Sequence, residues 1–240
     1  MRLNRFLAAA GVGSRRSCDE LIRDGHVTIN GTVCTDFSVQ PTENDHVKVR
    51  GKRVWVEKSL YLIMNKPIGF VSTRTDPNVR HTIFELLPPR FPRVFNIGRL
   101  DTQSEGLLIL TNDGDLAQRL SHPRHHVEKE YEVTLDRGFD PALIPELRAG
   151  MIIDGQQARM EKVQLIKPIR IRVVLRQGLN RQIRRMFARL GYDVRKLIRI
   201  RIGDLRLGAL PRGHWRPLTK GELRSLQAQP GLDRRPQNFN

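Results

Sequence analysis

The stretch "NIGRLDTQSEGLLILTNDGDL", residues 96–116, joins an acidic loop to a strongly apolar segment. Leu107–Leu110 is a short continuous apolar run of the kind that forms a buried strand, and Asn112–Gly114 ends it with a turn signal. Asp101 lies just before that run, in a polar loop with no catalytic partner close to it in sequence. A loop aspartate most often caps or braces a turn, so the rest of the chain must decide whether Asp101 has a chemical role.

The composition favours a partner rich in negative charge. The 240 residues carry a formal net charge of +17, and residues 165–206 alone hold 13 Lys or Arg against two Asp or Glu. Such a local excess predicts a surface that binds phosphates, most simply those of nucleic acid. The hydrophobic content of 39% is enough for a sizeable core, and no apolar stretch is long enough to span a membrane.

The N-terminus and the cysteines indicate the compartment. Gly11, Gly13 and Arg15 interrupt the first apolar stretch, which therefore lacks the core of a signal peptide. Cys18 and Cys34 are the two cysteines, and a pair in such a chain is more often reduced than a disulfide or half a zinc site. We expect a cytoplasmic protein, and a monomer as the default state.

Residues 1–50 have the pattern of a compact unit of helices and short strands. Leu3–Ala10 has helical spacing and is followed by glycines, and Ser14 is placed to cap a second helix that ends at Gly25. The Asn30-Gly31 pair then predicts a β-hairpin, and a second strand pair follows it. Two short helices and a small twisted sheet are the expected result.

This N-terminal pattern resembles the small RNA-binding domain named for ribosomal protein S4. The stretch "LNRFLAAAGVGSRRSCDELIRDGHVTINGTV" carries the resemblance over nearly its full length. It implies an RNA-binding unit, with Arg5, Arg15 and Arg16 exposed around the two helices and available to phosphates.

The sequence changes character after residue 50. We expect a linker at 51–59, a larger domain at 60–228 and a polar, disordered tail at 229–240. In the larger domain, predicted strands alternate with short helices, which indicates an α+β fold.

A helix is predicted between Asn180 and Leu190. Its buried stripe follows the spacing i, i+3, i+4, i+7 and consists of Ile183, Met186, Phe187 and Leu190. Arg181, Arg185 and Arg189 fall on the opposite side, where they face solvent or phosphates. Arg184 lies on the boundary between the two, where a planar guanidinium can reach a half-buried carboxylate or form a purely structural ion pair.

Metal, cofactor and nucleotide chemistry have little support. His122, His125 and His126 lie close together, but no cysteine or carboxylate follows at ligand spacing. The chain has no glycine-rich phosphate loop and no nucleophile-elbow serine. We therefore predict no metal and no cofactor, which leaves a carboxylate and RNA.

Three separated segments resemble the RsuA-like pseudouridine synthases, which convert uridine in ribosomal RNA to its C-glycoside isomer. They are "GRLDTQSEGLLILTNDG", "EKEYEV" and "GLNRQIRRMFARLGYDVRKLIRIRIGDLRLG", in the family's order. The resemblance covers roughly residues 1–227. It implies a catalytic domain with a mixed, mainly antiparallel sheet behind the N-terminal RNA-binding domain.

The resemblance also assigns roles to individual residues. It makes Asp101 the essential carboxylate, Tyr131 the ring that stacks on the target base and Arg184 the partner of Asp101. Leu197 would line the pocket, and Arg99 would sit at its mouth and help to hold the base out of the RNA helix. Lys66, in the matching "NKP" motif, is assigned to RNA binding, as are Arg181, Arg185 and Arg189.

Two classes of function remain in competition. The first is an rRNA pseudouridine synthase whose carboxylate acts either as a nucleophile at the sugar or as a base. The second is a non-catalytic RNA-binding or ribosome-assembly factor, for which a retained Asp101 would have no use. The segment "GLNRQIRRM" looks more like the members that act on large-subunit rRNA near the peptidyl-transferase centre than those that act on small-subunit rRNA, and tRNA stays open as a substrate.

Overall fold

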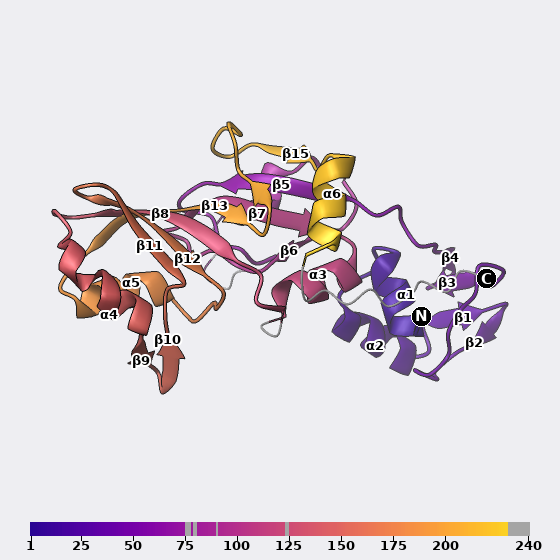
Figure 1. Cartoon of the computed structure of the whole chain (residues 1–240). Helices are drawn as coiled ribbons and strands as arrows, with labels where there is room; N and C mark the ends of the chain where they lie inside the picture. Colours follow the sequence, from indigo (N-terminus) through magenta and orange to yellow (C-terminus); the bar gives the residue numbers. More distant parts are fainter. Residues whose placement is uncertain (75–77, 79–80, 90, 123–124, 230–240) are drawn as a thin grey trace. The chain divides into compact units, whose positions relative to one another are not determined.

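In the computed structural model of the chain (Figure 1), residues 1–74, 78, 81–89, 91–122 and 125–229 are described. The chain divides into two units. The first contains Met1–Leu60 with two short later segments, and the second contains most of the remaining residues. The expected tail at 229–240 falls outside the described residues except for Gln229, so its disorder stays a prediction.

Two helices and a four-stranded sheet form the first unit, as the sequence predicted. Helix α1 is Leu3–Ala9 and α2 is Arg15–Arg23. Helix α2 starts where predicted because the Ser14 side chain accepts a hydrogen bond from the backbone N–H of Ser17 at 3.1 Å. The sheet has the order β2-β1-β3-β4, and its strands are β1 (Val27–Ile29), β2 (Thr32–Val33), β3 (Val47–Val49) and β4 (Lys52–Arg53).

Residues 51–59, expected as a linker, are not an extended connection throughout. Their first part is strand β4, which pairs with β3. Further on, the backbone N–H of Glu57 donates to the carbonyl oxygen of Ala9 at 3.2 Å. This region therefore packs with the first unit, because its backbone groups find their hydrogen-bond partners there.

A single large sheet organises the second unit. Its order is β11-β12-β8-β13-β7-β5-β15, with β14 paired to β13 and β6 to β7. Among the described residues its pairings are antiparallel except for β13 with β7. The expected α+β class with a mainly antiparallel sheet is therefore confirmed. The strands are β5 (Tyr61–Lys66), β6 (Phe95–Ile97), β7 (Glu105–Thr111), β8 (Lys129–Leu135), β11 (Lys162–Lys167), β12 (Arg170–Leu175), β13 (Val194–Ile202), β14 (Leu205–Arg206) and β15 (Trp215–Pro217).

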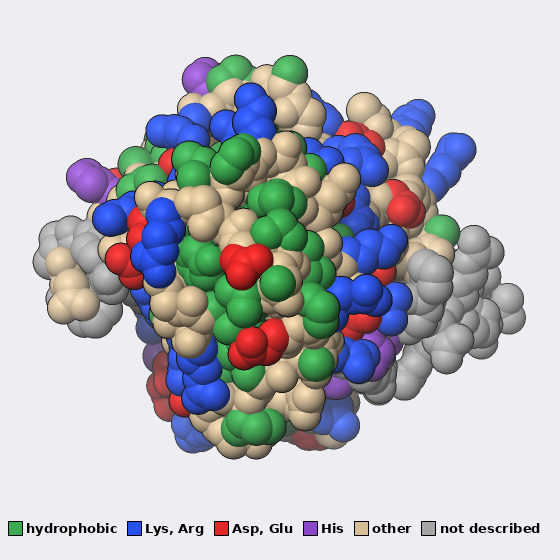
Figure 2. Space-filling model, turned by 60° about the vertical axis from the view of Figure 1, so that its left-hand side comes forward, with side chains coloured by type: hydrophobic (Ala, Val, Ile, Leu, Met, Phe, Trp, Pro, Cys, Tyr) green, Lys and Arg blue, Asp and Glu red, His purple; other side chains and the backbone are tan. Residues whose placement is uncertain are grey.

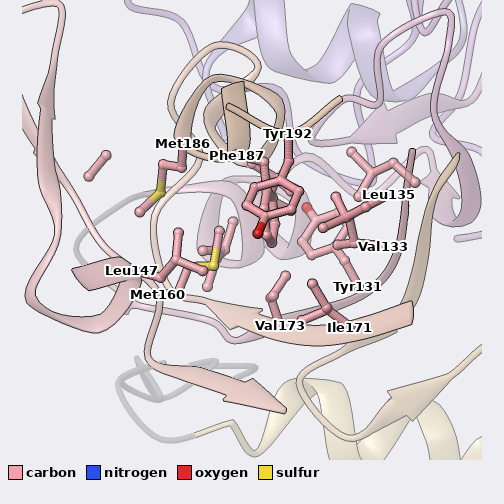
Figure 3. Packing of buried hydrophobic residues seen from close by; sticks show 14 of the residues in the cluster. Tyr131, Val133, Leu135, Leu147, Met160, Ile171, Val173, Met186, Phe187 and Tyr192 are labelled. Carbon is pink, nitrogen blue, oxygen red and sulfur yellow. The ribbon is translucent and has the colours of Figure 1, made fainter. Parts of the chain in front are cut away.

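Helices pack against both halves of this sheet and create two hydrophobic clusters. One cluster joins α4 and α5 to strands β8 and β12 (Figure 3). The other joins α3 and α6 to strands β5 and β7. The helical elements are η1 (Ile83–Leu86), α3 (Gly114–Ser121), η3 (Pro141–Leu143), α4 (Ile144–Ala149), α5 (Gln182–Arg189) and α6 (Lys220–Gln227), and a separate hairpin is formed by β9 (Met151–Ile153) and β10 (Gln156–Ala158).

The strongly basic region 165–206 is partly neutralised by carboxylates from other segments of the second unit. Four of its arginines form ion pairs within 3.2 Å: Arg172 with Glu132, Arg176 with Glu128, Arg185 with Asp154 and Arg201 with Glu130. Figure 2, which brings the α4 end of Figure 1 forward, shows a largely hydrophobic middle with Lys and Arg on both sides. The expected surface for phosphates is therefore smaller than the charge count of this region suggests.

Candidate active site

Asp101 lies in the loop between β6 and β7, directly before the most buried strand of the sheet. All seven residues of β7 are buried, whereas Asp101 is half-buried and lines a cavity of about 290 Å³. Its carboxylate has no hydrogen-bond or ion-pair partner among the described residues. The cavity is lined by Arg99, Leu100, Asp101, Ser104, Tyr131, Leu175, Gln177, Gly178, Leu179, Asn180, Arg181, Gln182, Ile183 and Leu197.

The backbone of this loop is held at every residue. The six carbonyl oxygens of residues 99–104 each accept a hydrogen bond of 2.8–3.4 Å. The donors, in the order of the acceptors, are Arg199 Nη1, Ser72 Oγ, Lys66 Nζ, the Gly69 backbone nitrogen, Arg184 Nη2 and Lys66 Nζ again. The carboxylate thus projects into the cavity from a fixed backbone, as pre-organised catalysis requires.

Lys66 was expected to bind RNA, but its position in the structure prevents contact with RNA. Its side chain is fully buried, and its Nζ donates to the carbonyl oxygens of Pro67, Asp101 and Ser104 at 2.8–3.1 Å. The three N–H groups of an ammonium match these three acceptors. Burial lowers the pKa of Lys66 to about 8, against the opposing charges of Asp101 and Glu105. The "NKP" motif therefore positions the Asp101 loop from inside.

We predict that Lys66 gives the protein a specific pH dependence of stability. The ordinary pKa of lysine is 10.5 and the folded value is about 8, so between these values the unfolded chain binds more protons. The free energy of unfolding should therefore rise from pH 8 to pH 10.5 relative to Lys66→Met, and the difference should be constant below pH 8. Urea titrations of both proteins at pH 7, 8.5 and 10 measure this difference. The same difference in the free energy of unfolding at all three pH values would contradict the prediction.

The fold brings five of the expected site residues to one cavity. Asp101, Tyr131, Leu197, Arg99 and Arg181 all line it. Tyr131 lies next to Val133 at the edge of the hydrophobic cluster (Figure 3), and the pairing of β8 with β13 sets Leu197 opposite Val133. An aromatic face, a branched aliphatic side chain and a carboxylate therefore surround one space, while Arg99 is exposed at the surface.

Arg184 lies beside Asp101 without forming the expected direct pair. Its guanidinium donates to the carbonyl oxygens of Val194 at 2.6 Å and Gln103 at 2.8 Å. No ion pair within 4 Å joins it to Asp101 among the described residues. Burial and the charge of Arg181 lower the pKa of Arg184, and the charge of Asp101 opposes this shift. The two carbonyls fix the guanidinium at the loop, close enough to act on Asp101 through its charge.

The other arginines assigned to RNA are not among the residues that line this cavity. Arg185 forms a bidentate ion pair with Asp154 in the β9–β10 turn, so it is not free to face phosphates as expected. Arg189 is exposed on α5, and Arg15 and Arg16 are exposed on α2, as the sequence predicted. Arg5, on α1, is half-buried rather than exposed.

Sequence reasoning missed two polar side chains at the site. Ser104 lines the cavity, and its buried hydroxyl has no hydrogen-bond partner among the described residues. Arg199 is 2% exposed and holds the loop through the carbonyl oxygen of Arg99. A signal for Arg199 existed: strand alternation puts it in phase with Leu197, on the buried face of β13.

Two further findings concern metals and membranes. In the described ranges, no cluster of three or more His, Cys, Asp or Glu side chains is arranged to hold a metal ion. None of the described helices combines the length and the apolar character needed to cross a bilayer.

Comparison with known proteins decides the family. The model for RNA pseudouridylate synthases matches residues 60–189, and the S4 domain model matches residues 1–47. The chain belongs to the RNA pseudouridine synthases. The first match includes Asp101, Tyr131 and Arg184, and the second covers the helices and the first strands of the N-terminal unit, so this synthase carries an S4 domain in front of its catalytic domain.

The synthase is similar to relatives over nearly its whole length. It is 41% identical to the dual-specificity RNA pseudouridine synthase RluF of Escherichia coli, over 94% of this chain and 78% of that protein. It is 36% identical to the ribosomal large subunit pseudouridine synthase B of Bacillus subtilis, over 95% and 96% of the two chains. A crystal structure of a pseudouridylate synthase superposes with a TM-score of 0.70 at 31% identity, over 94% of this chain and 99% of that one.

Proposed function

We propose that this synthase isomerises a uridine of large-subunit rRNA, with Asp101 as the reacting carboxylate. The observation that carries the proposal is the position of Asp101. It is the one acidic side chain among the described residues that line the cavity, and it shares that cavity with Tyr131 and Leu197. Its loop is held by hydrogen bonds to the backbone, so the carboxylate itself is left for substrate.

The reaction balances without any added atom. The bond between N1 of uracil and C1′ of ribose breaks, the base turns, and C5 bonds to C1′, while C5 loses a proton and N1 gains one. The carboxylate of Asp101 acts on the ribose either as a nucleophile at C1′ or as a base. The positive charges of Lys66 and Arg184 interact favourably with this carboxylate, which supports either role.

The target uridine must leave the RNA stack before it can reach Asp101. Tyr131 offers an aromatic face inside the cavity and Leu197 an aliphatic one, so a flipped uracil would lie between apolar walls. Arg99, exposed at the same cavity, is placed to hold the gap or a phosphate in the RNA. These walls also exclude water while the base is detached from the sugar.

The choice of large-subunit rRNA rests on the similarity of this chain to named relatives. One relative acts, by its name, on the large ribosomal subunit, and another is named as dual-specific. A tRNA or small-subunit rRNA substrate is the second candidate within the same chemistry. A non-catalytic RNA-binding role is disfavoured by the fixed and unpartnered carboxylate, which binding alone would not need.

Mapping of pseudouridine tests the proposal directly. Carbodiimide labelling and reverse transcription would be applied to rRNA and tRNA from cells that lack the protein, and from cells complemented with the intact chain or with Asp101→Asn. A large-subunit stop that the intact chain alone restores would support the proposal and name the uridine. A restored stop in tRNA or small-subunit rRNA would correct the substrate, and no restored stop would favour the binding role.

The S4 domain is expected to supply affinity rather than chemistry. Replacing Arg15 and Arg16, both exposed on α2, with alanine should raise KM for large RNA about tenfold, because phosphate contacts supply much of RNA affinity. It should leave kcat within about twofold and reduce the salt slope of binding by about two. The matched control replaces Lys52 and Arg53, exposed on β4. Equal effects of the two double variants would argue against a specific role for α2.

A further inference from the structure

A second cavity adjoins the one that holds Asp101. Its volume is about 190 Å³, and it shares Arg99, Tyr131, Gln177 and Gly178 with the first. Its own lining includes three Lys or Arg side chains, Lys129, Arg176 and Arg199, of which Arg176 is ion-paired with Glu128. The rest of the lining includes His122 and His126 and the apolar side chains of Ile97, Leu120, Val127 and Ile202. None of the described residues that line it is acidic.

The strand register explains why the carboxylates are absent from this cavity. Arg199 on β13 pairs with Tyr131 on β8, and Lys129 lies two residues before Tyr131 on the same face. Glu130 falls on the opposite face, where Arg201 binds it at 2.6 Å. The alternation of β8 therefore puts Glu130 and Glu132 on one face and Lys129 on the other, the face that Arg199 of β13 shares.

Neither cation has a carboxylate partner among the described residues, and Arg199 is buried while Lys129 is half-buried. Arg199 is 2% exposed, and its Nε donates to the carbonyl oxygen of Leu107 at 2.7 Å. Its Nη2 is buried and has no partner among the described residues. Lys129 donates to the carbonyl oxygen of Val127 at 3.1 Å. Burial and the charge of Arg199 together lower the pKa of Lys129 to about 8.

Burying two like charges side by side is costly unless an anion compensates them. The protein as described supplies no anion in this cavity, yet it keeps one donor of Arg199 unused. An anion that entered the cavity would accept from Lys129, and its charge would offset the repulsion between the two cations. The arrangement therefore fits an anionic ligand better than a purely structural role.

We propose that this second cavity binds a backbone phosphate of the RNA substrate, next to the uridine that enters the first cavity. The inference rests on the proposed function, because the shared wall of Arg99 and Tyr131 connects the phosphate to the flipped base. The apolar side chains that complete the lining would contact the ribose attached to that phosphate. Lys129 and Arg199 would thus set which face of the flipped nucleotide meets Asp101.

The test compares Lys129→Met with Lys167→Met, which removes an exposed lysine at the end of β11. Lys129→Met should weaken RNA binding about tenfold and lower the salt slope by about one. It should leave the melting temperature unchanged or higher, since a half-buried charge without a carboxylate partner is removed. Lys129→Arg, which keeps the charge, should retain more affinity than Lys129→Met. Wild-type affinity and salt slope in Lys129→Met would overturn the proposal.

A modified RNA distinguishes a backbone phosphate from a free anion. Short RNAs would carry one neutral methylphosphonate linkage on either side of the target uridine. One of the two linkages should weaken binding to the wild type about tenfold and to Lys129→Met about twofold or less. Equal losses in both proteins would overturn the proposal. If the wild type binds the RNA but converts no uridine, the proposed function fails, whereas the binding measurements still decide the phosphate site.

Discussion

Asp101→Asn should lower the rate of uridine isomerisation at least about 1,000-fold, because an amide can neither attack C1′ nor accept a proton as the carboxylate does. RNA affinity should change less than about twofold, since phosphate contacts supply most of it. The substitution keeps the size and shape of the side chain. Its effect should therefore be confined to the chemical step.

The structure predicts that this variant folds normally. The carboxylate of Asp101 has no hydrogen-bond partner among the described residues that the change could remove. The loop is held instead through the carbonyl oxygens of residues 99–104, which asparagine leaves in place. The melting temperature should stay within about 2 °C of the wild type, given that surface and unpaired changes cost little.

The measurement is single-turnover release of tritium from RNA labelled at C5 of uridine, because the C5 proton is lost as pseudouridine forms. Glu146→Gln, an exposed charge-matched change on α4, is the control and should keep wild-type rates. Full activity in Asp101→Asn would remove Asp101 from the mechanism. Loss of binding and activity together would show that Asp101 holds RNA rather than reacts with it.

Local patterns in the sequence were sufficient for much of the fold. The apolar stripe between residues 180 and 190 predicted helix α5, and it also put Arg184 at the boundary between core and solvent, where the structure has it half-buried. What the stripe could not give was the partner of Arg184. The acceptors are carbonyl oxygens of Gln103 and Val194. Every residue type has a backbone carbonyl, so the sequence does not mark these two as partners.

Contacts between residues far apart in the sequence explain the other differences between the sequence predictions and the structure. Lys66 is the last residue of β5, and a lysine at the end of a strand ordinarily faces water. Two of its three acceptors, however, come from the Asp101 loop, far along the chain. The surplus of arginines in 165–206 looked like a surface for phosphates, but the register of β8 with β12 and β13 supplies several of them with glutamates. Neither register nor burial of this kind can be derived from composition.

Gly106→Ala should be among the most destabilising single changes in the second unit. Gly106 has φ +105°, where alanine is strained. An added Cβ would lie 2.7 Å from the backbone nitrogen of Arg199 and closer still to its carbonyl oxygen. The clash involves backbone on both sides, so no side chain can move to relieve it. Gly106 pairs with Arg199 in the parallel pairing of β7 with β13, which would have to separate.

We expect a loss of about 3 kcal/mol or more in the free energy of unfolding, above the usual cost of overpacking. Activity should fall as well, because Arg199 ties β13 to the Asp101 loop through the carbonyl oxygen of Arg99, and to β7 through that of Leu107. The control is Gly208→Ala, at a positive φ of 59° with nothing within 4 Å of an added Cβ, which should cost about 1–2 kcal/mol. Urea unfolding measures both variants. Equal midpoints would show that strain alone acts at Gly106, and that the close approach of β7 and β13 does not constrain it.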